Sequence, residues 1–190
     1  MSRYLKEIHY QCRYSLPVWF IQILTAFLPD IGPFIRMRGY LVSLFLPNRP
    51  KGFLLGRDVT LLNINRLYIG DYVYIAKGAW LNAVGNIHLN SEVTLSPYVV
   101  ISSTVHGFKE GSVHRGGSHP AEVSVGFGSW VSSHSVVSAG VVIGKSVVIA
   151  ANSVVTTSTD DNVILGGVPA KYIKPRTDNP SNFKTKHDLS

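Results

Sequence analysis

The chain has 190 residues, which fits one domain with a small appendage and is too short for a two-domain enzyme with a separate cofactor domain. Hydrophobic residues make up 45% of the chain and charged residues 15%, so the disordered and fibrous classes of protein are excluded. The single cysteine, Cys12, excludes an internal disulfide framework and a zinc site of four cysteines, and a reducing cytoplasm is the default compartment.

The net charge of +7 is concentrated at the two ends of the chain. Residues 1–52 carry a net charge of +5, residues 53–170 carry −1, and residues 171–190 carry +3. A nucleic-acid-binding module more often shows a basic stripe with interleaved aromatic residues, which the middle of the chain lacks. We therefore expect no nucleic-acid partner. Anionic lipid head groups near the N-terminus and a phosphorylated ligand near the C-terminus are better expectations.

Residues 1–52 are predicted to form an N-terminal helical segment. Residues 16–28 are almost wholly apolar, but these 13 residues contain Pro17 and end at Pro29, and a bilayer-spanning helix needs about 20. No cleavage site of small residues follows, so a secretory signal is not expected. A second apolar run, residues 40–46, follows a basic pair. Short helices lying in a membrane interface fit this composition, and packing on the main domain or between subunits is the alternative.

From residue 55 onward an aliphatic residue recurs in steps of six, and three steps make an 18-residue turn. The residue four positions after each of these aliphatic residues is nearly always small or β-branched. The aliphatic set is Leu55, Leu61, Ile69, Ile75, Leu81, Leu89, Leu95, Ile101, Val125, Val131, Val137, Ile143, Ile149 and Val155. The second set is Val59, Val73, Ala79, Val93, Val99, Val105, Ser129, Ser135, Val141, Val147 and Ser153.

A period of six fits neither an α-helix nor a coiled coil, and an antiparallel sandwich has no fixed period. The pattern predicts a triangular prism in which each hexad supplies one short strand and one corner. The aliphatic side chains point inward, the small ones fit where the faces converge, and strands of successive turns pair in parallel.

The period has one long break, between Ile101 and Val125, where 24 residues replace six and Gly, Ser and His are frequent. Function concentrates where a rigid scaffold carries an irregular loop. His106 comes just as the strand from Ile101 ends, so the coil is expected to position its imidazole.

In these features the sequence resembles the hexapeptide-repeat acyltransferases, and most closely the colanic-acid-type and the maltose- and galactoside-type sugar O-acetyltransferases. The resemblance covers about residues 55–176. It is carried by the repeat, by LSPYVVISSTVHGF (95–108), by residues 125–142, by AWLNAVGNIHL (79–89) and by GGVPAK (166–171). It implies an all-β fold, a left-handed parallel β-helix.

The predicted organisation has three parts. An N-terminal α-helical, membrane-interfacial segment (1–52) precedes the β-helix acyltransferase domain (53–170), which has one long loop excursion (106–124). A basic C-terminal tail (171–190) follows.

The resemblance implies an acetyl-CoA-dependent O-acetyltransferase that acts on a sugar hydroxyl of a bacterial surface polysaccharide or its precursor. Acetyl-CoA is the cosubstrate and no metal is implied. A homotrimer is expected, with active sites between subunits. The expected location is the cytoplasm, with peripheral contact at the inner face of the cytoplasmic membrane.

The resemblance assigns His106 as the general base, a role that suits imidazole near neutral pH. Several relatives place an acidic residue directly after this histidine, whereas Gly107 stands here. The group that orients His106 therefore stays open between Glu110, Glu122 and a backbone carbonyl.

Four residues are candidates for substrate binding: Asn82, His114, His119 and Glu110. Asn82 matches an asparagine of the colanic-type motif, although an asparagine at a corner often only bonds its own backbone. The two histidines lie in the Gly-rich loop and face either substrate or solvent.

The resemblance also implies a coenzyme A groove along the C-terminal coils, in which a backbone N–H near Ser133 would stabilise the oxyanion by about 3 kcal/mol. The cations after the last coil would meet the phosphates, or else form a solvated tail. The predicted cofactor-binding residues are Trp130, Ser133, Ala139, Ala151, Thr156, Lys171, Lys174 and Arg176.

Three alternatives stay open because the repeat is less specific for chemistry than for fold. The first is an N-acetyltransferase of an amino sugar or antibiotic, and the second is a noncatalytic, membrane-associated scaffold. The third is a γ-type carbonic anhydrase, in which His114, His119 and either His106 or His88 would bind zinc.

Overall fold

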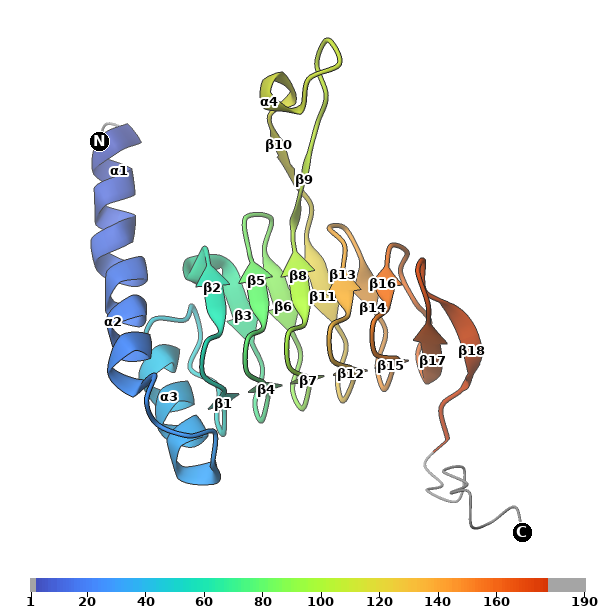
Figure 1. Cartoon of the computed structure of the whole chain (residues 1–190), viewed down its shortest axis with the longest axis horizontal. Coiled ribbons are helices and arrows are strands. Elements are labelled where there is room, and N and C mark those ends of the chain that lie inside the picture. The colour runs from blue at the N-terminus through green and yellow to red at the C-terminus, as the bar shows by residue number, and fades with distance from the viewer. Residues whose placement is uncertain (1–2, 178–190) are drawn as a thin grey trace.

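A computed structural model describes residues 3–177 of the chain as a long β-solenoid with helices across its N-terminal end (Figure 1). The strands form three sheets that run the length of the solenoid. A two-stranded ribbon projects from its middle, and β18 (Lys171–Pro175) folds back at the C-terminal end.

The helical segment differs from the predicted short helices. The elements α1 (Arg3–Tyr10), the π-helical stretch η1 (Gln11–Ser15) and α2 (Leu16–Thr25) follow one another without a break. Pro17 does not end the helix because it lies in the first turn of α2, directly after a π-helical stretch that accommodates its missing N–H. The helix α3 (Gly32–Ser43) then packs between α2 and the first strand. Within residues 3–177, no helix is both long and apolar enough to cross a bilayer.

The three sheets are named A, B and C. Sheet A contains β1 (Leu54–Leu55), β4 (Tyr74–Ile75), β7 (Thr94–Leu95), β12 (Trp130–Val131), β15 (Val148–Ile149), β17 (Val163–Gly166) and β18. Sheet B contains β2 (Thr60–Leu62), β5 (Trp80–Asn82), β8 (Val100–Ser102), β13 (Val136–Val137) and β16 (Val154–Val155). Sheet C contains β3 (Leu67–Ile69), β6 (Ile87–Leu89), β11 (Val123–Val125) and β14 (Val142–Ile143). The 3₁₀ turn η2 (Ile64–Arg66) precedes β3.

Neighbouring strands pair in parallel throughout the three sheets, except that β18 is antiparallel to β17. This pairing confirms the predicted parallel β-helix. Partners are 18 residues apart in the later coils, as in Trp130 and Val148, but 20 apart in the first ones, as in Leu54 and Tyr74.

The interior follows the predicted hexads closely. Every aliphatic position of the repeat is buried except Leu61, which is partly buried. Ser129, Ser135 and Ser153 are buried as well, and each hydroxyl donates to a backbone carbonyl at 2.6–2.9 Å, so the core contains polar groups that are satisfied.

Val105 is the exception among the predicted small or β-branched interior positions. It is 49% exposed, because the chain has already left the coil and Val105 belongs to the projecting ribbon. Val105 still stands four residues after Ile101, as the repeat requires, but its backbone no longer follows the coil.

Arg38 of α3 joins the helical segment to the first coil. Its side chain is almost fully buried, and Nη1 donates to Asp30 Oδ1 at 2.8 Å and to the Leu55 carbonyl at 2.9 Å, while Nη2 donates to the Leu28 carbonyl at 3.0 Å. Burial raises the pKa of the nearby Tyr74 hydroxyl and Asp30 raises it further, while Arg38 opposes them. The Arg38 guanidinium thus binds the Asp30 carboxylate, the loop before α3 and the first strand of the coil at the same time.

We expect Arg38→Met to lower the free energy of unfolding by about 3 kcal/mol, because it removes the charged partner of the Asp30 carboxylate and the side-chain donor to the Leu55 and Leu28 carbonyls. Urea unfolding followed by circular dichroism measures the change. The control is Arg36→Met on the exposed side of the same helix. Equal stability of the two variants would show that the buried pair does not hold the helices to the coil.

Candidate active site

One corner of the prism carries most of the predicted site. The B–C corner is the turn that follows Asn82, Ser102, Ser138 and Thr156 in successive coils, which the strand register places in one column. The chain leaves the coil here after Ser102 and resumes it at β11.

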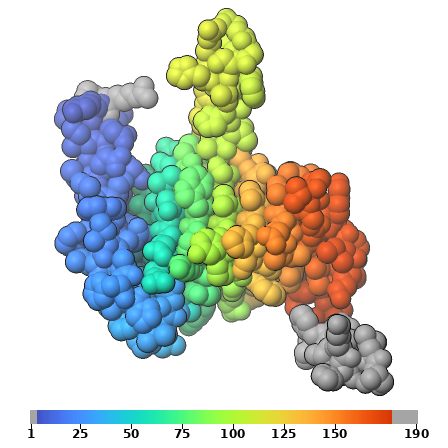
Figure 2. All heavy atoms as spheres, in the orientation of Figure 1, coloured from blue at the N-terminus to red at the C-terminus, as the bar shows by residue number. Residues whose placement is uncertain are grey.

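The excursion, residues 104–122, is an antiparallel ribbon of β9 (Thr104–His106) and β10 (Ser118–Pro120), with the short helix α4 (Val113–Gly116) near its tip. It stands clear of the coil (Figure 2). Its root is fixed because the Ala121 N–H donates to the Ser103 carbonyl at 2.8 Å, and the Gly140 N–H donates to the Ala121 carbonyl at 3.3 Å.

Gly107 follows His106 at a point of close approach. A Cβ on Gly107 would lie 2.5 Å from His119 Nε2 and 2.8 Å from the Gly116 carbonyl oxygen. The packing of the ribbon therefore excludes an acidic side chain directly after His106.

His106 lines a hollow of about 440 Å³ together with Val113, His114, Gly117 and Ser118. The structure thus brings two of the predicted site histidines together. The His106 side chain is exposed and makes no hydrogen bond or ion pair with any residue from 3 to 177. His119 is exposed on the opposite strand, paired with Val105, and does not line this hollow.

The carboxylates considered as orienting groups for His106 pair elsewhere. Glu110, near the tip of the excursion, forms an ion pair with Arg115. Glu122 Oε2 lies 3.5 Å from His88 Nε2, and the His88 ring stacks on Tyr68 with 4.6 Å between centroids. This Tyr68–His88–Glu122 cluster on sheet C was not foreseen from the sequence, because its members lie 20 and 34 residues apart.

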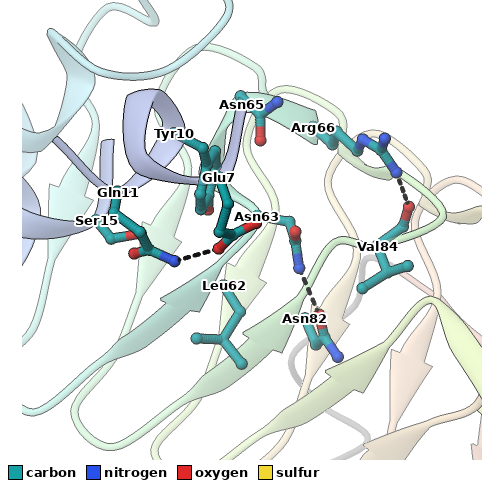
Figure 3. Close-up of a pocket in the computed structure, with 10 residues that line it drawn as sticks. All are labelled: Glu7, Tyr10, Gln11, Ser15, Leu62, Asn63, Asn65, Arg66, Asn82 and Val84. Atoms are coloured by element: carbon teal, nitrogen blue, oxygen red, sulfur yellow. Dashed lines mark hydrogen bonds between the residues drawn. The ribbon is translucent and has the colours of Figure 1, made fainter. Parts of the chain in front are cut away.

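Asn82 lies in a second, larger hollow of about 590 Å³ between the N-terminal helix and the first coils (Figure 3). Asn82 Oδ1 accepts a hydrogen bond from Asn63 Nδ2 at 3.0 Å. The lining combines amides, a carboxylate, a guanidinium and an aromatic ring: Glu7, Tyr10, Gln11, Ser15, Leu62, Asn63, Asn65, Arg66, Asn82 and Val84. Such groups can form hydrogen bonds with a polyhydroxylated molecule.

Most of these lining residues were missed from the sequence, since they come from the helical segment and from a turn without a motif. One signal was available. The step from Leu61 to Ile69 is eight residues instead of six, and three polar residues, Asn63, Asn65 and Arg66, lie within it.

The predicted pantetheine-binding residues divide between two corners. Ser133 and Ala151 occupy equivalent positions of the turn between sheets A and B, where the Asn152 N–H donates to the Ser133 carbonyl at 3.0 Å. Ala139 and Thr156 lie at the B–C corner, on the other edge of sheet B. The Ser133 N–H has no hydrogen-bond partner in the described part of the chain.

The remaining predicted cofactor-binding residues lie along sheet A and its C-terminal end. Trp130 is exposed on β12, and its Nε1 donates to Ser96 Oγ at 2.8 Å. Lys171 and Lys174 are exposed on β18, whereas Arg176 is partly buried and its Nε donates to the Ser146 carbonyl at 2.9 Å.

Among residues 3–177, no three His, Cys, Asp or Glu side chains are grouped so that they could hold a metal ion. The histidines considered for zinc are accordingly not brought together as a set of three ligands.

Similar proteins were found by sequence and by structure, although no protein-family model matches the chain. The galactoside O-acetyltransferase of Escherichia coli K12 is 30% identical over 100 residues, which cover 53% of this chain and 49% of that protein. A second E. coli K12 protein, provisionally named colanic acid biosynthesis acetyltransferase WcaF, is 27% identical over 168 residues, covering 86% of this chain and 88% of that protein. The chain thus spans about half the length of the galactoside O-acetyltransferase that it matches.

Among solved structures, a hexapeptide-repeat containing acetyltransferase from Vibrio cholerae superposes with a TM-score of 0.76 at 17% identity, covering 90% of this chain and 94% of that one. Its complex with acetyl coenzyme A superposes with a TM-score of 0.67 at 18% identity, covering 88% and 89% of the two chains. At this identity the likeness establishes the fold. The fold class predicted from the repeat, a left-handed parallel β-helix, is confirmed, and the chain is similar in sequence to these sugar acetyltransferases and in fold to a hexapeptide-repeat acetyltransferase.

Proposed function

We propose that this protein is an acetyl-CoA-dependent O-acetyltransferase whose acceptor is a sugar hydroxyl of a bacterial surface polysaccharide or its precursor. The observation that carries the proposal is the single long interruption of the coil, which holds His106 beside an open hollow. The names of the relatives, a galactoside O-acetyltransferase among them, support the reaction type. In this proposal the enzyme acts as a homotrimer in the cytoplasm, at the inner face of the membrane.

His106 acts as the general base. The acceptor oxygen attacks the thioester carbonyl carbon while its proton passes to the imidazole. The carbon–sulfur bond then breaks, the proton passes to the departing sulfur, and the products are an acetyl ester and the free thiol of coenzyme A. The exposure of His106 and the lack of a partner for it among residues 3–177 support this role, because its ring nitrogens are open to substrate.

The acceptor binds between the excursion and the hollow around Asn82. Asn82 belongs to the same B–C corner column as the root of the excursion, one coil earlier, which supports a shared acceptor site. His114 contacts the acceptor within the hollow of His106. Glu110 and His119 are placed by the proposal at the outer margin of that site, on the exposed surface of the excursion.

Acetyl coenzyme A lies along the C-terminal coils. The Ser133 N–H stabilises the oxyanion, Trp130, Ala139, Ala151 and Thr156 contact the pantetheine arm, and Lys171 and Lys174 meet the phosphates. Arg176 contributes positive charge from a guanidinium that is tied to the coil. Ser133 and Ala151 lie at one corner of the prism, and Ala139 and Thr156 lie at another. This division supports a site to which a neighbouring subunit contributes.

We expect His106→Ala to lower the rate of thiol release from acetyl coenzyme A by about a thousandfold with a panel of glycan acceptors, because it removes the general base. The matched control is His9→Ala, an exposed histidine that lines neither hollow. Unchanged release in the His106 variant would remove this residue from the mechanism, and release with amine acceptors alone would favour N-acetylation.

Asn82→Ala is expected to lower kcat/KM for the acceptor by about tenfold, because an uncharged hydrogen-bonding partner is lost, and to leave KM for acetyl coenzyme A unchanged. Steady-state kinetics with each substrate varied in turn separates the two effects. Asn90→Ala is the control, since Asn90 lies at an exposed corner outside this hollow. An equal effect on both substrates would contradict an acceptor role for Asn82.

The double variant Lys171→Gln, Lys174→Gln is expected to raise KM for acetyl coenzyme A by about tenfold, because two contacts to phosphate are weakened. Acetyl-dephospho-coenzyme A, which lacks the 3′-phosphate, should be affected less. Lys77→Gln, at the other end of the coil, serves as the control. If both cosubstrates respond equally, these lysines do not recognise the 3′-phosphate.

A further inference from the structure

One side of the N-terminal helix packs on the coil, and the other side, which is apolar, does not. Val18 and Thr25 are buried, and Gln22 Nε2 donates to the Val59 carbonyl at 2.5 Å, so this side is held on the first coil. The other side is exposed, and its side chains recur at helical spacing along α1, η1 and α2. They are Tyr4, Leu5, Ile8, Leu16, Trp19, Phe20, Ile23, Leu24 and Phe27, between 42% and 78% exposed.

We call these nine residues the outer apolar face. No charged residue lies between Arg13 and Asp30, so the α2 part of the face is free of charge. Soluble monomers rarely expose a contiguous apolar surface of this extent without a partner for it.

The helix that carries the outer apolar face lies on the outside of the molecule, although Trp19 and Ile23 also line a hollow of about 220 Å³ with Asp58 and Thr60 of the first coil. This helix is the outermost element at the N-terminal end of the solenoid, and α3 lies between α2 and β1 (Figure 1). Two hydrogen bonds to the first coil fix the orientation of the helices: Gln22 of α2 donates to the Val59 carbonyl, and Arg38 of α3 donates to the Leu55 carbonyl. The outer apolar face is therefore accessible to a partner, because the opposite side of the helix already packs on the coil.

The helical segment that carries the face also carries exposed positive charge. Lys6, Arg13 and Arg36 are exposed on the same helical segment. Of the two acidic residues of the segment, Asp30 pairs with the buried Arg38, whereas Glu7 is exposed and accepts a hydrogen bond from Gln11 at 2.6 Å. The helical segment thus combines an exposed apolar and aromatic side with exposed cations.

We infer that the outer apolar face docks on a membrane surface that contains anionic phospholipid. Aromatic side chains favour the boundary between head groups and acyl chains, and basic residues beside an apolar helix are attracted to anionic head groups. A helix of this kind lies in the plane of the interface. A two-fold pairing of this face with a second copy would instead bring like charges together.

The inference predicts flotation of the full-length protein with vesicles of phosphatidylcholine and phosphatidylglycerol, and much weaker flotation with phosphatidylcholine alone. Trp19→Ser with Phe20→Ser is expected to lower the partition coefficient by at least about tenfold, because two large side chains no longer enter the lipid. Lys6→Gln with Arg36→Gln is expected to weaken binding to the anionic vesicles and reduce its dependence on salt.

The matched control is Tyr172→Ser with Ile173→Ser, on β18 at the opposite end of the coil. These side chains are 60% and 55% exposed, against 57% and 56% for Trp19 and Phe20. Circular dichroism and urea unfolding verify that both double variants are folded. The assay contains neither acetyl coenzyme A nor acceptor, so its outcome does not depend on the proposed reaction.

Three results would overturn the inference. One is the failure of the wild-type protein to float with anionic vesicles, and another is an equal loss of binding in the β18 control. The third is a fall in molecular mass, by light scattering, of the Trp19 and Phe20 variant while its vesicle binding persists, which would identify the face as a subunit interface.

Discussion

The narrow interior of the prism is the constraint on which the rest of the structure depends. Three sheets converge on one axis, so each strand contributes one inward aliphatic side chain, and each turn between strands contributes one small or β-branched residue. Strands of successive coils must also stay in register to satisfy their backbone groups. A residue inserted into a strand would break both conditions, whereas a residue inserted at a corner breaks neither.

The chain uses only one of the three corners for insertions. The corners between sheets A and B and between sheets C and A keep four residues in every coil, from Gly56–Val59 through Ala150–Ser153 in the first case. The B–C corner holds the two extra residues of each early coil and the whole excursion. Both hollows at which the acceptor is proposed to bind therefore adjoin this corner, because it is where side chains can be added without disturbing the ladder.

The sequence predicts well those features that one physical rule imposes at every coil. The burial of Leu95 or Val137 follows from the period alone, and it was foreseen. The hollow that the N-terminal helix completes above Asn63 and Asn82 depends on how a distant helix lies on the first coils. No local pattern encodes that placement. The excursion was located by its broken period, but its ribbon geometry, and with it the exposure of Val105, was not foreseen.

The separation of the predicted coenzyme-binding groups has a geometric consequence. Ser133 and Ala151 lie on one edge of sheet B, Ala139 and Thr156 lie on the other edge, and β13 and β16 run between them. An extended pantetheine arm that follows one corner of a prism contacts only the groups of that corner. The two sets can serve one coenzyme only where the corner of one chain lies beside the other corner of a second chain. A closed ring of identical chains, joined through different surfaces, produces this arrangement at every interface. A site divided in this way is incomplete in one chain, and His106, which has no internal partner among residues 3–177, would obtain its orienting group from the neighbouring chain.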